Sequence, residues 1–288
     1  MTAHWRQNLR GIAAMLIAVG ALSLMDASLK TLSQHYGAWQ VACLRGLATL
    51  PVVIVWIALS GGFQQVIRVR FPLHVARGVL GIVSLAAFAF GVRHLRLSEA
   101  YTIFFVAPLL ITAFAALVLR EKVDARRWMV IIVGFAGVLI VLRPSGEGTI
   151  SLAGLAILAC AVGYALSAIT VRILGRTDST QSMVFWLMLF VAVGAGILAL
   201  PDWRPIQRAD WPVIGAMVIT GSIGQWAITE AFKLGEASVI APLEYTALVW
   251  GVGLDWVLWR ILPLPRTFVG AAVVIACGIY LIRRERSP

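Results

Sequence analysis

The sequence LSEAYTIFFVAPLLITAFAALVLR at residues 97–120 is echoed by LGEASVIAPLEYTALVWGVGLDWVLWR at residues 234–260. The echo continues in both copies, so that the related segments cover residues 97–143 and 234–283. The offset between the copies is 137 residues where they start and 140 residues at the arginine that ends each quoted stretch, so one three-residue insertion aligns them. Duplicated halves of this kind are a common plan for membrane carriers, whose site lies where the halves meet.

The composition of the chain is that of a membrane protein. Of its 288 residues, 60% are apolar and 13% are charged, whereas about 25% of the residues in a soluble domain are charged. The net charge of +11 does not indicate a nucleic-acid partner, because the basic residues are spread over the loops. Three cysteines lie singly in separate apolar stretches, without metal-ligand spacing, so neither a metal nor another cofactor is expected: Cys43, Cys160 and Cys277.

Ten apolar stretches are long enough to cross a membrane as helices. A bilayer core of ~30 Å needs about 20 apolar residues in a helix, and the connections between these stretches are too short for a soluble domain. We therefore predict an all-α integral membrane protein with ten transmembrane helices, in which residues 1–145 form a first five-helix repeat and residues 146–288 a second. The predicted helices span residues 11–34, 37–59, 75–92, 100–119, 128–142, 148–171, 179–201, 211–229, 237–259 and 267–282.

The positions of lysine and arginine favour an orientation with both chain ends in the cytoplasm. This orientation places 15 of these residues on the inner side and 8 on the outer side, while Arg45 lies within the membrane. Because five is an odd number, the second repeat must enter the membrane from the opposite side, and the two repeats are inverted. Such symmetry lets a central cavity open to each side in turn. The alternative is that duplication merely built a stable helix bundle.

Polar residues recur at helical spacing inside several of the apolar stretches. In lipid, such residues collect on the face that meets protein or a water-filled cavity. The helices that match between the repeats, namely the first, third and fourth of each half, should therefore line a shared central cavity. The alternative for each serine and threonine is a hydrogen bond to the backbone of its own helix. The predicted substrate-binding residues of the cavity are Ser23, Ser84, Tyr101, Tyr164, Ser167, Gln225, Trp226, Thr229 and Tyr245.

Two charged residues, Asp26 and Arg45, lie inside predicted membrane helices. They are about equally far from a turn near residues 35–36, so they should lie at equal depth on adjacent antiparallel helices. An unpaired charge at the bilayer centre costs ~2.5–3.5 kcal/mol on insertion scales, which favours a fixed salt bridge between them. The alternative is that one of them exchanges partners with a charged substrate.

Three further residues are candidates for coupling or gating. Glu244 has no obvious partner in the sequence, and we consider it the first candidate for a proton-coupling group. Pro108 and Pro242 lie near the middle of the fourth and ninth predicted helices. Each proline removes a backbone donor and strains the preceding turn, so it could act as a bending point or as a static kink.

The LSEA–Pro–LREK run at residues 97–122, the GFAGVLIVLRP segment at residues 134–144 and the echo in the second half resemble the drug/metabolite transporter superfamily. The chain is similar to its ten-helix EamA-type members over nearly all residues, and it also resembles the bacterial exporters of aromatic and other neutral amino acids in that group. The resemblance implies cytoplasmic termini, a cavity between the halves and export from the cytoplasm. The second copy departs at residues 259–262, where WRIL stands in place of LREK, which weakens any transfer of residue roles between the copies.

The sequence thus predicts an alternating-access transporter that exports small amphipathic metabolites, above all aromatic and other neutral amino acids. Aromatic walls suit apolar side chains and can hold an ammonium group, and Arg45 could meet a carboxylate. The alternatives are export of cationic drugs, nucleosides or vitamins, or a structural membrane protein without transport activity. An enzyme is not expected, because the chain has no H-E-x-x-H, G-x-S-x-G or P-loop motif.

The expected partners are a small-molecule substrate and the lipid bilayer, without nucleic acid. A monomer would suffice for this function. The expected location is the bacterial cytoplasmic (inner) membrane, which the chain crosses several times with both termini in the cytoplasm.

Overall fold

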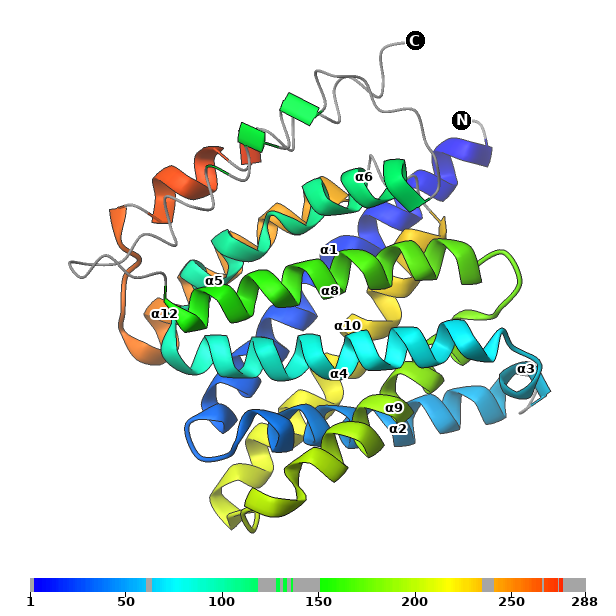
Figure 1. Cartoon of the computed structure of the whole chain (residues 1–288), viewed down its shortest axis with the longest axis horizontal. Coiled ribbons are helices and arrows are strands. Elements are labelled where there is room, and N and C mark those ends of the chain that lie inside the picture. The colour runs from blue at the N-terminus through cyan, green and yellow to red at the C-terminus, as the bar shows by residue number, and fades with distance from the viewer. Residues whose placement is uncertain are drawn as a thin grey trace.

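The computed structural model describes residues 3–60, 64–118, 128–129, 132–133, 136, 151–234, 241–265, 267–273 and 275–276. In this part of the chain every regular element is helical, as the apolar stretches predict (Figure 1). The α-helices are α1 (Ala3–Ser33), α2 (Ala38–Leu59), α3 (Gln64–Ile67), α4 (Phe71–His94), α5 (Leu97–Phe104), α6 (Ala107–Val118), α8 (Leu152–Leu174), α9 (Thr180–Ala199), α10 (Trp211–Leu234) and α12 (Ala247–Trp259). Three 3-10 helices are η1 (Leu200–Asp202), η2 (Arg208–Asp210) and η3 (Ala241–Thr246).

Six helical spans within the described residues are long and apolar enough to cross a membrane. Their mean hydropathy lies between 1.2 and 2.5, and large apolar side chains such as Val55 and Val79 are exposed on them. Lipid tails can cover such a surface, which water would not favour. The chain is therefore a multi-pass membrane protein. The six spans are Arg10–Ser33, Ala38–Leu59, Phe71–His94, Leu152–Leu174, Thr180–Asp202 and Arg208–Ala231.

The predicted helix at residues 100–119 is interrupted in its middle. The α5 helix ends at Phe104 and the α6 helix begins at Ala107, so Pro108 lies in the first turn of α6. At this position the missing backbone N–H of proline breaks no helical hydrogen bond. In the second copy Pro242 lies in η3, directly before α12. A break in the α-helix thus accompanies each proline, whereas their role in gating stays a prediction.

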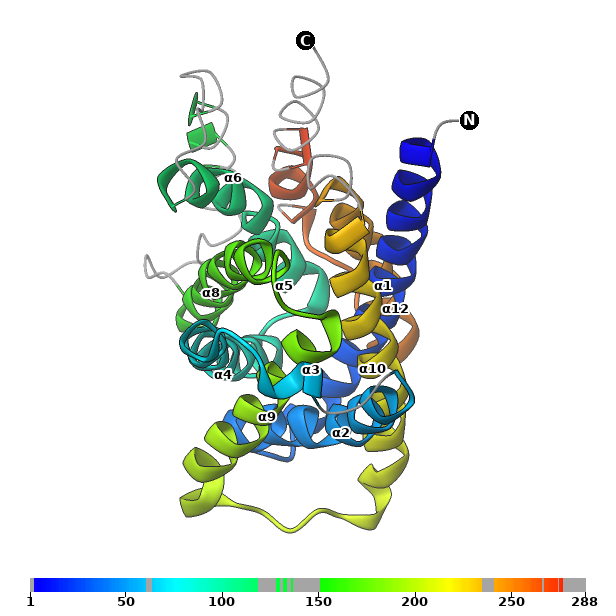
Figure 2. The same ribbon diagram turned by 90° about the vertical axis from the view of Figure 1, so that its right-hand side faces the viewer.

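Helices that are far apart in the sequence lie side by side. The α1 helix packs along α10, the α8 helix packs along α4, α2 faces α9, and α5 faces α12. Figure 2 shows α4 and α8 on one side of the molecule, α1, α10 and α12 on the other, and α2 and α9 beneath them. The α2–α9 contact is close because Gly46 has no side chain: a Cβ atom there would lie 2.6 Å from the backbone nitrogen of Ala192.

Several predictions fall on parts of the chain that the structure describes little or not at all. The predicted helices at 128–142 and 267–282 lie mostly outside the described residues, and so does the predicted boundary between the repeats at residues 145 and 146. The short pieces that are described there, such as 267–273, are helical. The count of ten helices and the inversion of the repeats therefore stay predictions.

Candidate functional site

A central cavity of about 220 Å³ lies between helices from the N-terminal and the C-terminal half of the chain. The α1, α2, α4 and α5 helices supply one part of its lining, and α8, α9, α10, η3 and α12 supply the other. Residues three or four positions apart share one face of a helix, and this spacing brings several polar side chains of α4 and of α8 into the lining. The polar residues of the lining are Ser23, Asp26, Arg45, Arg77, Ser84, Tyr101, Cys160, Tyr164, Ser167, Gln225 and Glu244.

Each part of the lining contains a tyrosine that donates a hydrogen bond to a carboxyl group. The hydroxyl of Tyr101 on α5 donates to Asp26 Oδ2 on α1, at 3.0 Å. The hydroxyl of Tyr164 on α8 donates to Glu244 Oε1 on η3, at 2.8 Å. The structure therefore gives Glu244 the partner that the sequence did not reveal. Both carboxyl groups border the cavity, where they could meet a positively charged group.

Two arginines face the same cavity but are held differently. Arg77 on α4 is buried, and it donates from Nε to Ser167 Oγ at 3.1 Å and from a terminal nitrogen to the carbonyl of Met183 at 2.8 Å. Arg45 on α2 donates to Gln225 Oε1 at 3.5 Å, the long end of the hydrogen-bond range. The protein thus fixes the guanidinium of Arg77 more firmly than that of Arg45.

The predicted salt bridge between Asp26 and Arg45 is not formed. Both residues line the cavity, as their equal depth suggested, but no ion pair within 4.0 Å joins them in this structure. Asp26 instead accepts a hydrogen bond from Tyr101, and Arg45 reaches toward Gln225. The prediction was wrong because it assumed that the two groups have no other polar neighbours, whereas α5 and α10 supply them.

Aromatic rings form a large share of the cavity wall. Phe88, Phe104 and Phe105 line the cavity together with the two tyrosines. The ring of Phe104 packs against Tyr164 with 5.1 Å between the ring centres. Such rings can cover an apolar substrate group, and their faces attract a cation. Phe104 was not among the predicted site residues, although it lies three residues after Tyr101 and shares its helix face.

Five of the predicted residues do not belong to the cavity lining: Trp226, Thr229, Tyr245, Pro108 and Pro242. The side chain of Trp226 is 45% exposed, because consecutive residues of a helix point about 100° apart and Gln225 takes the inward position. Thr229 is buried and donates to the carbonyl of Gln225 at 2.7 Å, which is the alternative considered for such residues. Tyr245 is buried with its ring against Phe105, 5.1 Å between centres.

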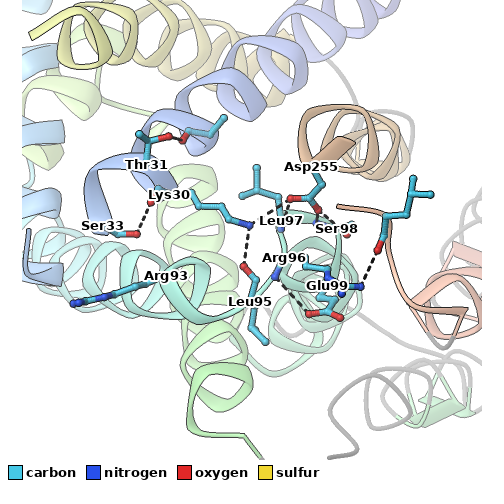
Figure 3. Close-up of polar contacts among 12 residues, drawn as sticks. Lys30, Thr31, Ser33, Arg93, Leu95, Arg96, Leu97, Ser98, Glu99 and Asp255 are labelled. Atoms are coloured by element: carbon cyan, nitrogen blue, oxygen red, sulfur yellow. Dashed lines mark hydrogen bonds and ion pairs between the residues drawn. The ribbon is translucent and has the colours of Figure 1, made fainter. Parts of the chain in front are cut away.

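One buried polar network was not predicted from the sequence. Asp255 on α12 accepts hydrogen bonds from the backbone N–H groups of Leu97 at 3.1 Å and Ser98 at 3.0 Å, and from the hydroxyl of Ser98 at 2.8 Å. Lys30 on α1 lies 3.4 Å from the same carboxylate and donates to the carbonyl of Leu95 at 3.1 Å. Figure 3 shows the lysine pointing toward both acceptors.

This network ties three helices together beside the cavity. The carboxylate of Asp255 caps the first turn of α5, where helical N–H groups have no partner within the helix. Lys30 lies one helical turn beyond Asp26, so the network adjoins the cavity on α1. Only the pairing of residues 225 positions apart places the ammonium group of Lys30 among protein atoms.

Two further carboxylates join loops to the starts of helices. Asp178, between α8 and α9, accepts hydrogen bonds from the His74 ring at 2.7 Å and from the backbone N–H of Arg70 at 3.3 Å. Partial burial opposes ionisation of Asp178, but hydrogen bonds from Thr177, His74 and Arg70 outweigh it and lower its pKa below the ordinary value of 3.8. In a second such contact, Asp210 at the end of η2 accepts a hydrogen bond from the Tyr36 hydroxyl at 2.6 Å.

The sequence profile of the EamA-like transporter family matches residues 9–143 and again residues 151–284. The chain belongs to the EamA-like transporter family. The two matches together span most of the chain. This finding agrees with the resemblance to the EamA-type members of the drug/metabolite transporter superfamily.

Several characterised transporters are similar to this chain along its length. It is 27% identical over 282 residues to the riboflavin transporter of Vibrio cholerae, covering 96% of this chain and 94% of the relative. It is 24% identical over 281 residues to the pseudopaline exporter CntI of Pseudomonas aeruginosa, covering 96% and 97%. The S-adenosylmethionine uptake transporter of Rickettsia prowazekii is 23% identical over 279 residues, covering 96% and 94%.

A solved crystal structure of a protein with 20% sequence identity has the same fold, with a TM-score of 0.68 over 96% of this chain and 99% of that chain. Together with the family, these relatives show that the protein is a small-molecule transporter in a membrane. Its relatives are transporters rather than enzymes, in keeping with the sequence. None of the three relatives is named for an amino acid, so these comparisons do not support the predicted amino-acid export.

Proposed function

We propose that the protein is an alternating-access carrier whose central cavity binds small amphipathic metabolites that have both a positive and a negative group. The observation that supports this proposal is the mixed lining of the cavity. Two carboxyl groups, two guanidinium groups and several aromatic rings face the same space. Ionisable side chains within a membrane are costly and mark substrate paths by default.

The packing of the helices supports an inverted repeat with boundaries near residues 145 and 146. If α1 corresponds to α8 and α4 to α10, the contact between α1 and α10 has its counterpart in the contact between α8 and α4. The contact of α2 with α9 joins corresponding elements, and the contact of α5 with α12 joins parts of the fourth predicted helix of each half. Exchange of contacts between two repeats in this way is the geometry expected of an inverted pair with five helices in each half.

The two tyrosine–carboxyl hydrogen bonds of the cavity lie one in each half, with the positions of the two residue types swapped. In the first half the carboxyl group is on α1 and its tyrosine is on α5, while in the second half the tyrosine is on α8 and the carboxyl group is on η3. With both termini in the cytoplasm of a bacterium, as the arginine and lysine positions favour, the cavity would open in turn to the cytoplasm and to the outside of the inner membrane.

Aromatic and other neutral amino acids are the first substrate candidates. Their ammonium and carboxylate groups complement the charged groups of the lining, and an apolar side chain suits the phenylalanines. The cavity volume of about 220 Å³ lies below the ~300–1,000 Å³ that is usual for drug-sized ligands. In this conformation the cavity therefore favours a molecule near the size of an amino acid.

A second candidate class is larger aromatic metabolites such as riboflavin and S-adenosylmethionine. The similarity to transporters named for these two molecules favours this class. Their aromatic ring systems would use the same phenylalanines and tyrosines. Binding of such substrates would require the cavity to widen from the volume seen in this structure.

Transport into and out of proteoliposomes tests the proposal. The purified protein is reconstituted, and the movement of radiolabelled phenylalanine, tryptophan, leucine, riboflavin and S-adenosylmethionine is measured in both directions, because the relatives include both an exporter and an uptake transporter. We expect saturable movement of at least one compound above protein-free liposomes. Equal rates with and without protein for the whole panel would contradict the proposal.

A steric block tests whether the cavity is the path. Gly163 lines the cavity, and a Cβ atom there would meet Ser84 Oγ. We expect Gly163→Leu to abolish transport. Gly215→Leu on the exposed part of α10, where a Cβ atom meets nothing within 4 Å, is the matched control and should leave transport unchanged.

A further inference from the structure

We propose that Asp26 and Arg45 form a socket for the head group of an α-amino acid, with the ammonium group at Asp26 and the carboxylate at Arg45. This inference rests on the proposed transport function and names the part of the substrate that the cavity recognises. It follows from an unusual arrangement: two opposite charges are neighbours in a membrane cavity without forming an ion pair.

Asp26 on α1 and Arg45 on α2 both line the cavity, and each is the main charged neighbour of the other. They lie on helices joined by a tight turn, so the same short segment of chain sets both positions. The head group of an α-amino acid has its ammonium and carboxylate on one carbon atom. Such a head group needs an acid and a base that lie close together, as these two residues do.

Both groups keep hydrogen-bonding capacity that the protein leaves unused. Tyr101 donates to Oδ2 of Asp26, which is the one hydrogen bond of this carboxyl group among the described residues. A guanidinium has five N–H donors, and within the described part of the chain Arg45 uses one of them, at 3.5 Å to Gln225. Each group can therefore accept a substrate charge without first losing a short protein contact.

Holding opposite charges apart inside a membrane is unfavourable, because neither charge is neutralised where the surroundings are poorly polarisable. A molecule that places its own ammonium and carboxylate between them completes two charge-assisted hydrogen-bonded pairs at once. A molecule that has only one of the two groups leaves a protein charge unpaired.

The other charged groups of the cavity do not offer this combination. Arg77 already donates to Ser167 and to the carbonyl of Met183 at short distances. Glu244 lies on η3, with Tyr164 as its hydrogen-bond partner in the described part of the chain. Glu244 therefore lies outside the proposed socket, because it has the same tyrosine–carboxyl contact as Asp26 but no arginine as its main charged neighbour.

Three probes with the same ring separate the two charges: phenylalanine has both groups, phenylalaninamide has only the ammonium, and 3-phenylpropionate has only the carboxylate. Binding to the purified protein is measured by calorimetry in detergent. We expect wild type to bind phenylalanine the most tightly, by on the order of 10- to 100-fold, the size of one charge-assisted hydrogen bond. Arg45→Gln should lower the affinity for phenylalanine to that for phenylalaninamide. Asp26→Asn should lower the affinity for phenylalanine to that for 3-phenylpropionate.

Two further variants keep the test decisive if a single substitution impairs folding. The double variant Asp26→Asn/Arg45→Gln leaves no single uncompensated charge, and we expect it to bind the three probes with similar affinity. Asp202→Asn, which removes an exposed carboxylate of η1 outside the cavity lining, is the matched control and should keep the preference for phenylalanine over both analogues.

The outcomes separate the socket from the transport function. If wild type binds the three probes with equal affinity, or if Arg45→Gln and Asp26→Asn keep the wild-type order of affinities, the proposed socket is wrong while the transport proposal stands. If wild type binds none of the probes and moves no amino acid in proteoliposomes, amino-acid transport and the socket are both refuted.

Discussion

Replacement of Asp255 by asparagine should be among the most destabilising single substitutions in the membrane part of the protein. The Asp255 side chain is 1% exposed and that of Lys30 is 9% exposed, with 3.4 Å between the ammonium and the carboxylate. Asparagine has one acceptor oxygen and one NH2 group, so one backbone N–H of Leu97 or Ser98 would face another donor. Lys30 would also lose its counter-charge.

The size of the effect follows from the breaking of a buried pair. Removal of one partner of such a pair costs ~3–5 kcal/mol, because the other charge stays buried without compensation. At about 2–4 °C per kcal/mol for domains of 150–250 residues, this loss corresponds to a fall in Tm of roughly 6–20 °C. Lys30→Met should lower the free energy of unfolding by less than Asp255→Asn does, because the N–H groups of Leu97 and Ser98 still stabilise the carboxylate.

Thermal unfolding of the purified protein in detergent, followed by circular dichroism, measures these losses. The double variant Lys30→Met/Asp255→Asn completes the cycle, and we expect it to lose less stability than the two single variants combined. A Tm for Asp255→Asn within about 2 °C of wild type would show that the network does not hold α1, α5 and α12 together. Strict additivity would show that the two charges do not interact.

Three more predictions concern packing, pH and the cavity wall. Gly46→Ala should lower the free energy of unfolding by ~1–3 kcal/mol, because its new Cβ atom meets the α9 backbone at 2.6 Å. Gly215→Ala, with nothing within 4 Å of the new Cβ atom, should leave this free energy unchanged or raise it by up to about 1 kcal/mol. A loss of stability at Gly215 as large as that at Gly46 would contradict the close packing of α2 on α9. The pKa of Asp178 in the folded state is lowered below 3.8, so its ionised carboxylate contributes to the free energy of unfolding above pH 3.8 and this contribution is lost as the pH falls through the folded-state pKa. The difference in Tm between wild type and Asp178→Asn should therefore shrink in acid and stay constant near neutral pH. A difference that grows in acid would show that the pKa of Asp178 is not lowered by folding. Tyr164→Phe should raise the KM for transport several-fold, while Trp226→Phe on the outer surface should leave it unchanged, and the reverse pattern would overturn the placement of the cavity.

The helices could be predicted from the sequence because apolar length is a strong signal. The pattern also indicated that Asp26, Ser84, Tyr101 and Tyr164 share an interior, since helical spacing and the cost of polar groups in lipid both point inward. Helix faces were harder to assign for neighbouring residues. Gln225 and Trp226 are adjacent and were both predicted to line the cavity, whereas only Gln225 does so and Trp226 is 45% exposed.

Contacts between distant segments were beyond the sequence. Lys30 and Asp255 are 225 residues apart, and nothing local to either residue indicates that they meet. The same limit explains the mistaken salt bridge of Asp26 with Arg45. Spacing around a turn predicted that the two residues lie near each other, and both line the cavity. The competing partners Tyr101 and Gln225 come from helices whose positions depend on the tertiary fold.

The alternating exposure of the cavity can be tested most directly at Cys160. This residue lines the cavity and is 7% exposed, and Cys43→Ala with Cys277→Ala leaves it as the single thiol. A membrane-impermeant thiol reagent is applied to right-side-out and to inverted vesicles, with and without substrate. We predict labelling from both sides and protection by substrate on each. Labelling from one side only, or labelling that no transported compound reduces, would contradict a cavity that opens to each side in turn.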